Sequence, residues 1–257
     1  MNRIGLLIAL AVGAAVGLLF GLYPGLDLAF SAPFYDTATG RWLGFGPVPG
    51  LLRDASMWLV ALVAAPAFIA LAVKLVRPRR PLAIPGRAAV LMIATLALGP
   101  GILTNVVLKD NSGRARPADV TEFRGPDQFH PWWDMRGTCD KNCSFVAGEP
   151  SGALWTLSVA AVAPPAWRAL GYGAALVFGA AVGLLRMAGG GHFFTDAVFG
   201  GVSTFLVIWL VHGLLYRWRP TRIGDAAVER ALERLALPGH DALLRLIALL
   251  RGGDGKA

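Results

Sequence analysis

The sequence predicts an all-α protein, a polytopic membrane bundle of six transmembrane helices. Of its 257 residues, 55% are hydrophobic and only 16% are charged, whereas a soluble domain carries about 25% charged residues. Apolar runs long enough to cross a hydrocarbon core of about 30 Å recur along the chain. The six runs cover residues 4–23, 57–73, 88–108, 151–167, 169–185 and 197–216.

Three of these runs carry features that affect how they fold. Residues 4–23 follow a short basic N-terminus, as a signal peptide would, but their length and the lack of a small-residue cleavage site favour a retained helix. The motif LGPG at 98–101 predicts a kink in the third helix. Pro164 and Pro165 interrupt the fourth run, which makes it the weakest of the six.

The basic residues predict the orientation of the bundle. The formal net charge is +8, but the cations gather in loops on one side of a six-span topology, and no nucleic-acid-binding motif accompanies them. Cytoplasmic loops are enriched in Lys and Arg, so we expect both termini in the cytoplasm. The cations on this side are Arg3, Lys74, Arg77, Arg79, Arg80, Arg87, Arg217, Arg219 and Arg222.

The segments at the two ends of the chain have separate predicted roles. The first outer loop, residues 24–56, is rich in aromatic residues, Gly and Pro, and we expect Trp42 and Trp58 in an aromatic belt at the membrane interface. Residues 223–257 follow the last span and alternate apolar and charged residues at helical spacing. A Pro-Gly pair at 238–239 divides them into two short amphipathic helices on the cytoplasmic membrane surface.

The long outer loop, residues 109–150, is polar and long enough to carry function. It holds Cys139 and Cys143, the only cysteines of the chain. A disulfide between them would persist outside the cytoplasm, and free thiols are the alternative, since two cysteines fall short of a zinc site. The loop and its flanks also hold several cations. Long loops tolerate such charges on the outer side, and the alternative is that some of these cations bind an anionic ligand. The cations are Lys109, Arg114, Arg116, Arg124, Arg136 and Lys141.

The sequence KDNSGRARP closes the third predicted helix. Lys109 and Arg116 are seven residues apart, about two helical turns, so both side chains face one direction if the helix continues. The planar fork of Arg fits phosphate oxygens, and Lys adds a point charge. Juxtamembrane Lys and Arg are common, so this cluster alone is a weak indication of phosphate binding.

The sequence RMAGGGHFFTD, residues 186–196, joins the last two predicted helices. His192 and Asp196 are four residues apart and are neighbours on one helical face. A carboxylate on one imidazole nitrogen leaves the other nitrogen free to attack. Arg186 adds a further cation, and the three glycines let the backbone approach a ligand closely. A histidine that merely caps a helix is the alternative.

Together the two clusters resemble the first and third signatures of the type 2 phosphatidic acid phosphatase superfamily. The matching patterns are Lys-x6-Arg-Pro, from Lys109 to Pro117, and Arg-x5-His-x3-Asp, from Arg186 to Asp196. The resemblance covers residues 85–215 of a predicted membrane domain, residues 1–222.

This resemblance implies a role for each residue. His192 would attack phosphorus to form a phosphohistidine, Asp196 would orient it, and Lys109, Arg116 and Arg186 would hold the phosphate oxygens. The active site would lie at the outer membrane interface, and the family implies no metal and no other cofactor. Phosphoryl transfer depends mainly on such positioning and charge stabilisation.

The second signature of the family, Pro-Ser-Gly-His, is altered in this chain. PSGA at 150–153 copies three letters but puts Ala153 in place of the histidine, which protonates the leaving oxygen. VAGE at 146–149 puts Glu149 there instead, and we prefer this register because acid catalysis requires an ionisable group. Gly148 then lies at a helix start, where backbone amides favour an anion. Leu185 also replaces the serine that begins the third signature.

Glu149 has two possible roles. As the acid, it would have to carry a proton at neutral pH, which apolar surroundings favour and nearby cations oppose. As a brace, it would stay ionised and hold Arg116 or Arg186. If Glu149 is only a brace, the site lacks a general acid. Such a site would suit a leaving group that departs without being protonated, such as the phosphate of a pyrophosphate.

The resemblance implies a metal-independent hydrolase, a lipid phosphate phosphatase of the bacterial cytoplasmic (inner) membrane with its active site facing the periplasm. Its substrate would be a lipid A phosphate, undecaprenyl or another polyprenyl pyrophosphate, phosphatidylglycerol phosphate or phosphatidic acid. The VAGE variation and the cysteines favour the first two. The alternatives are a lipid phosphotransferase that uses the same phosphohistidine and a non-catalytic lipid-phosphate binder. The expected partners are the lipid and the bilayer, not nucleic acid.

Overall fold

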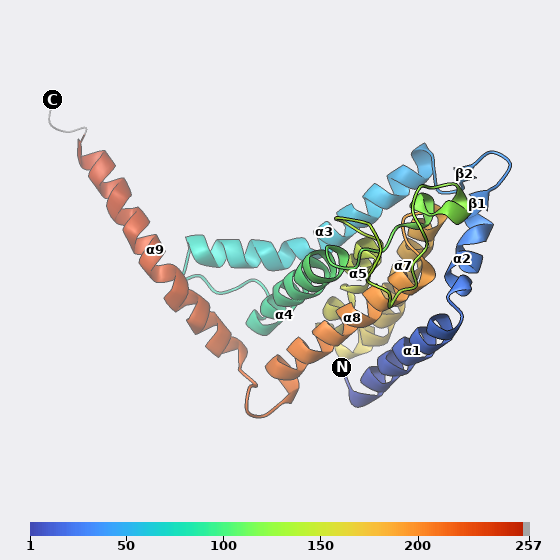
Figure 1. Ribbon diagram of the computed structural model, residues 1–257. Helices are drawn as coiled ribbons and strands as arrows, with labels where there is room; N and C mark the ends of the chain where they lie inside the picture. The colour runs from blue at the N-terminus through green and yellow to red at the C-terminus, as the bar shows by residue number, and fades with distance from the viewer. Residues whose placement is uncertain (254–257) are drawn as a thin grey trace.

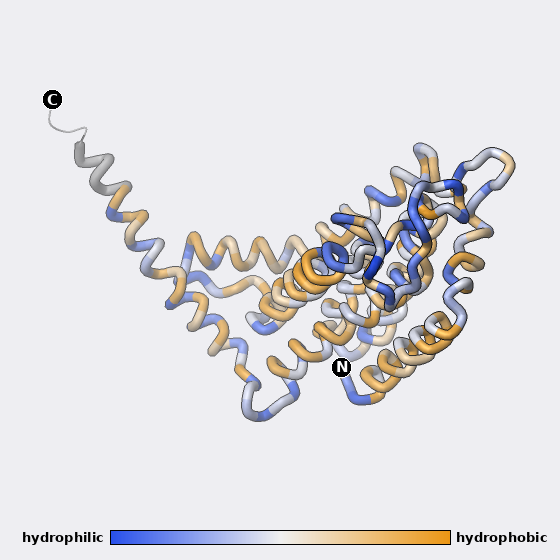
Figure 2. The backbone as a smooth tube through the Cα atoms, in the orientation of Figure 1, coloured by the Kyte–Doolittle hydropathy of each residue, from blue (hydrophilic) through white to orange (hydrophobic). Residues whose placement is uncertain are grey.

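The computed structural model describes the backbone of residues 1–253 and the side chains of residues 1–246. It is an all-α bundle (Figure 1). Within the described residues, five helices are long and apolar enough to cross a membrane, and hydrophobic residues predominate along the bundle in Figure 2. These spans are α1 (Arg3–Leu22), α3 (Pro47–Val76), α4 (Gly86–Leu96) with its π-helical continuation η2 (Ala97–Lys109), α7 (Pro165–Ala188), and α8 (Phe194–His212) with η5 (Gly213–Arg217).

Five of the six expected transmembrane helices form as long continuous helices, and the fourth run crosses the bundle only as a broken segment, from the cap end where α5 begins to the opposite end where α7 begins. Residues 151–167 do not form one helix; the chain makes two short ones, α5 (Gly148–Leu154) and α6 (Leu157–Val162), and then turns at Pro164 into α7. Residues 148–162 would measure about 22 Å as a helix, less than the hydrocarbon core. The pair packs inside the bundle, where α5 contacts α3, η2, α7 and α8.

The third span changes geometry at the LGPG motif. Regular α-helix ends at Leu96, and η2 continues with π-helical hydrogen bonding through Pro100 to Lys109. A proline donates no backbone hydrogen bond, and the side chain of Asn105 donates to the carbonyl of Pro100 at 2.6 Å. The helix ends at Lys109, so Lys109 and Arg116 do not share one helical face.

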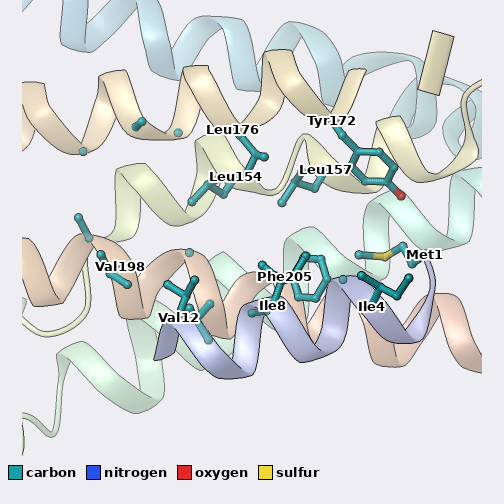
Figure 3. Close-up of a pocket in the computed structure, with 18 of the residues that line it drawn as sticks. Met1, Ile4, Ile8, Val12, Leu154, Leu157, Tyr172, Leu176, Val198 and Phe205 are labelled. Carbon is teal, nitrogen blue, oxygen red and sulfur yellow. The ribbon is translucent and has the colours of Figure 1, made fainter. Parts of the chain in front are cut away.

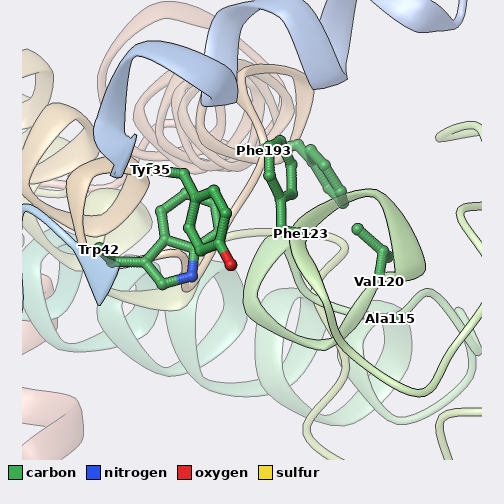
Figure 4. Close-up of a cluster of buried hydrophobic side chains, with 6 residues drawn as sticks. All are labelled: Tyr35, Trp42, Ala115, Val120, Phe123 and Phe193. Carbon is green, nitrogen blue, oxygen red and sulfur yellow. The ribbon is translucent and has the colours of Figure 1, made fainter. Parts of the chain in front are cut away.

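A small cap of loops lies over one end of the bundle. The first outer loop contributes Trp42, which is buried at 5% exposure in an aromatic cluster with Tyr35, Phe123 and Phe193 (Figure 4). Trp42 is therefore not part of an interfacial belt, whereas Trp58 is 75% exposed. The short elements of the cap are α2 (Gly25–Ser31), η1 (Ala32–Phe34), the antiparallel strands β1 (Tyr35–Asp36) and β2 (Arg41–Trp42), η3 (Pro117–Asp119) and η4 (Thr121–Phe123).

The tail forms one helix, α9 (Asp225–Gly253), rather than two. It runs through Pro238 and extends away from the bundle (Figure 1). Its first turns attach to the connection between α3 and α4, where Asp225 accepts hydrogen bonds from Arg87 and Glu229 accepts one from the amide of Leu82. The rest of the predicted tail, residues 254–257, lies outside the described residues.

Candidate active site

The ends of four elements meet beneath the cap. There η2 ends at Lys109, α5 begins at Gly148, α7 ends just after Arg186, and the loop before α8 carries His192. Lys109 is nearly buried, at 9% exposure. A Cβ on Gly148 would lie 2.9 Å from the side-chain oxygen of Asn105 and 3.6 Å from Nζ of Lys109, so the start of α5 packs closely against the lysine.

One loop residue joins Lys109 to Arg116. The lysine Nζ donates to the side-chain oxygen of Asn142 at 2.8 Å, and Nη2 of Arg116 donates to the backbone carbonyl of the same residue at 2.7 Å. Asn142 lies between Cys139 and Cys143, which form a disulfide in the structure. The loop closed by the disulfide therefore connects Lys109, at the end of η2, with Arg116, which lies beyond that helix.

Two glycines, Gly190 and Gly191, leave room for the side chains of Trp42 and Arg186. A Cβ on Gly191 would collide with the guanidinium of Arg186, and a Cβ on Gly190 would lie 2.6 Å from the ring of Trp42. Gly190 also has a positive φ of 65°, which glycine adopts without strain. The space beside these glycines is filled by protein side chains, not left open for a ligand.

His192 is buried at 1% exposure, with a hydrogen bond of 2.8 Å between its Nδ1 and the carbonyl oxygen of Ser144. A carbonyl only accepts hydrogen bonds, so Nδ1 carries the proton and Nε2 keeps its lone pair. Burial, and then the charges of Arg186, Lys109 and Arg116, hold the pKa of His192 well below its ordinary value. A neutral imidazole among three cations is suited to attack an anion that the cations attract.

The lowered pKa gives a first testable prediction. His192 should remain neutral at pH 6, where an unperturbed histidine, with a pKa of about 6.5, is mostly protonated. NMR of ring-labelled histidine in detergent measures this directly, and the spectrum of the His192→Gln variant assigns the resonance. Titration of that resonance at pH 6.5 or above would contradict the prediction. The sign follows from burial and positive charge, since both disfavour the imidazolium.

Asp196 is near His192 but does not contact it directly. Its Oδ2 lies 3.9 Å from Nδ1 of His192 and accepts instead from the Ser144 hydroxyl at 2.5 Å and the Phe193 amide at 2.8 Å. The residue whose carbonyl orients the histidine is thus itself held by Asp196. The sequence predicts a direct contact between Asp196 and the imidazole, whereas in the structure Ser144 lies between them.

A buried ion network supports Asp196 from behind. Arg114, at 1% exposure, donates from Nη1 to Oδ1 of Asp196 at 2.5 Å and from Nη2 to Asp27 of α2 at 2.7 Å. Asp27 also accepts from the hydroxyl and the amide of Thr195. The network ties α2, the long outer loop and the start of α8 together around the histidine.

Glu149 lies between two arginines. Its Oε1 accepts from Arg53 of α3 at 2.7 Å, and its Oε2 pairs with Nε of Arg186. Ala153, the alternative residue for the altered signature, is buried within α5. The structure therefore brings Glu149, not Ala153, to the site, and both carboxylate oxygens are engaged by cations.

Comparison with known proteins identifies the family. A model of the PAP2 superfamily matches residues 88–222, more than half of the chain. The chain belongs to the PAP2 superfamily. It is a membrane lipid phosphate phosphatase, a hydrolase.

Three PAP2 relatives are informative. A lipid A 4'-phosphatase of Francisella tularensis subsp. novicida is 33% identical over 84% of this chain and 98% of its own length. A lipid A 4'-phosphatase of Rhizobium leguminosarum is 36% identical over 45% of this chain and 49% of its own length. A crystal structure of a phosphatidylglycerolphosphate phosphatase from Bacillus subtilis covers 82% of this chain and 94% of its own, with a TM-score of 0.50 and 20% identity. That structure supports the PAP2 fold.

The candidate site contains five further residues whose specific roles the sequence does not indicate. Asp27, Arg53, Arg114, Asn142 and Ser144 all contact a predicted site residue or its direct partner. Asp27 had a readable signal, because it is a lone carboxylate within the apolar stretch GLDLAF, and such residues usually have a function. Within the described residues, no group of three or more His, Cys, Asp or Glu side chains gathers that could hold a metal ion.

Proposed function

We propose that this phosphatase removes the 4'-phosphate of lipid A at the outer face of the bacterial cytoplasmic membrane. The observation that carries the chemistry is a neutral, buried His192 among Lys109, Arg116 and Arg186. The substrate is suggested by the relative from Francisella tularensis subsp. novicida, which aligns over 84% of this chain. The other substrates that the family resemblance allows have no comparable support.

The proposed reaction has two steps. Nε2 of His192 attacks phosphorus, the bond from phosphorus to the sugar oxygen breaks, and that oxygen takes a proton from water as the dephosphorylated lipid leaves. Water then attacks the phosphohistidine, which releases inorganic phosphate and restores the neutral imidazole. The three cations hold the equatorial oxygens in both steps, and such fixed charges provide most of the rate enhancement in phosphoryl transfer.

We assign Glu149 a positioning role. Its two oxygens hold Arg53 and Arg186 at the same time, and an ionised brace serves this purpose better than a protonated acid. Glu149→Gln should therefore raise KM for the lipid by about tenfold, which is the loss of about 1.4 kcal/mol of binding, and leave the alkaline limb of the pH–rate profile in place.

The matched variant for this test is Arg53→Gln, which removes one of the two arginines that Glu149 contacts and should also raise KM. Steady-state kinetics over a pH series measure both effects. If Glu149→Gln instead removes the alkaline limb and leaves binding intact, the carboxyl group is the acid that protonates the sugar oxygen.

The distribution of charge supports the proposed orientation. The basic connection between α3 and α4 and the basic segment after α8 lie at the end of the bundle opposite the cap. Cytoplasmic loops carry such an excess of Lys and Arg. The cap and the site would then face the periplasm, and both termini would lie in the cytoplasm.

The test of the proposed function is phosphate release by the purified protein in detergent. The panel is lipid A, polyprenyl pyrophosphate, phosphatidylglycerol phosphate and phosphatidic acid. We expect release from lipid A at its 4' position, which mass spectrometry of the product locates. Preferred hydrolysis of another lipid would overturn the substrate, and transfer of phosphate to an added acceptor lipid without release would indicate a phosphotransferase.

A further inference from the structure

A long apolar groove runs along the bundle from Met187 and Phe194, beside the site, to Met1 and Arg168 at the opposite end. It has a volume of about 960 Å³ and lies between α1 and α7, with α5, α6 and α8 behind it. Figure 3 shows aliphatic and aromatic side chains along its length, among them Ile8, Leu157 and Phe205. A groove of this composition between transmembrane helices suits a hydrocarbon chain.

Cations gather at the end of this groove opposite the site. Arg168 lines the groove at the start of α7, and Arg217 donates to the backbone carbonyl of Met1, a residue that lines the groove as well, at 3.3 Å. Among residues 1–246, no carboxylate forms an ion pair with either arginine, so their charges are left without a counter-ion from this part of the chain.

Hydrogen-bonding groups at the same end also lack partners. Tyr172 Oη, His212 Nδ1 and Arg217 Nη2 are buried atoms without a hydrogen bond, and the hydroxyl of Tyr172 borders the groove in Figure 3. Buried polar atoms are almost always hydrogen-bonded. All three groups can donate, so an acceptor would satisfy them, and the positive charges of Arg168 and Arg217 favour an anion.

We propose that this groove binds an anionic phospholipid from the leaflet opposite the site. The lipid phosphate would accept hydrogen bonds from Arg168, Arg217 and Tyr172, and its acyl chains would fill the groove between α1 and α7. In the orientation proposed above this is the cytoplasmic leaflet, which is rich in anionic lipids, and basic pockets between transmembrane helices bind such head groups. The proposed head-group site lies at the end of the groove opposite Lys109, Arg116 and Arg186, so the proposal does not depend on the proposed substrate.

Native mass spectrometry of the full chain with phosphatidylglycerol tests the proposal. We expect one tightly retained phosphatidylglycerol and weaker retention of phosphatidylcholine, which carries no net charge. The Arg168→Gln/Arg217→Gln double variant should lose affinity for phosphatidylglycerol by about tenfold, or about 1.4 kcal/mol. Ala9→Trp, which fills the groove without changing its charge, should reduce retention of the same lipid.

Two matched variants locate the lipid. Arg222→Gln removes an exposed charge at the same end of the chain, and Arg116→Gln removes a cation at the opposite end of the bundle; both should retain phosphatidylglycerol. Thermal unfolding of each variant checks that it is folded. Retention by the double variant at the level of the unmodified protein, equal retention of phosphatidylcholine, or loss of binding in Arg116→Gln alone would overturn the proposal.

Discussion

His192→Gln should reduce phosphate release by at least about 10³-fold, because the nucleophile is lost while the three cations that bind phosphate remain. The substitution keeps a polar side chain of similar size beside the Ser144 carbonyl, which accepts the hydrogen bond from Nδ1 in the structure. Lipid binding should therefore be largely retained. A substrate with a radiolabelled phosphate gives a second measurement, since the labelled, acid-labile phosphoenzyme expected with the unmodified protein should be absent from the variant.

The control for this prediction is His240→Gln, which changes a histidine of α9 far from the site and should leave the rate unchanged. Substantial phosphate release by His192→Gln would exclude this residue as the nucleophile. A phosphoenzyme that survives in the variant would assign the covalent step to another side chain.

Arg114→Met should be the most destabilising single change near the site. It leaves Asp27 and Asp196, which are 1% and 0% exposed, without their shared cation. Removing one partner of a buried ion pair costs about 3–5 kcal/mol, because an uncompensated charge stays in the interior. The melting temperature in detergent should fall by about 10 °C, and the rate should fall with it because Ser144 and His192 lose their support.

The exposed Arg124 supplies the matched control. It donates from the surface of the same loop to the carbonyl of Thr37, and Arg124→Met should change the melting temperature by no more than 1–2 °C, in keeping with the small effects of most surface substitutions. Equal melting temperatures for the two variants would show that the Asp27–Arg114–Asp196 network contributes little to stability.

Much of the site could be predicted from the sequence, because its principal residues occur in two compact patterns. The spacing within 186–196 and from Lys109 to Arg116 carries the family resemblance, and the family is confirmed. The indirect path from Asp196 through Ser144 to His192 could not be predicted, since it depends on a loop that returns to the site from 48 residues earlier. Arg53 was missed for the same reason, as its contact with Glu149 joins residues 96 positions apart.

The errors in the fold arose where local sequence signals competed. The run at 151–167 is apolar enough for a span, but burial among neighbouring helices lets the chain break at Trp155, whose indole donates to the carbonyl of Met92. At 238–239 the proline was expected to end a helix, yet α9 continues through it. Aromatic belts at membrane interfaces are common, so the sequence favours an interfacial position for Trp42. In the folded cap, however, Trp42 packs against Gly190.

The short loop between Cys139 and Cys143 has a consequence for when the protein becomes competent. Asn142, at the tip of that loop, is what joins Lys109 to Arg116. In a reducing compartment the loop would lose its covalent closure, and the position of Asn142 would depend on hydrogen bonds alone, such as the one from its backbone amide to Asp110. In the proposed orientation the loop lies in the periplasm, where disulfides persist, so the site would reach its full affinity for phosphate only after the chain has entered the membrane.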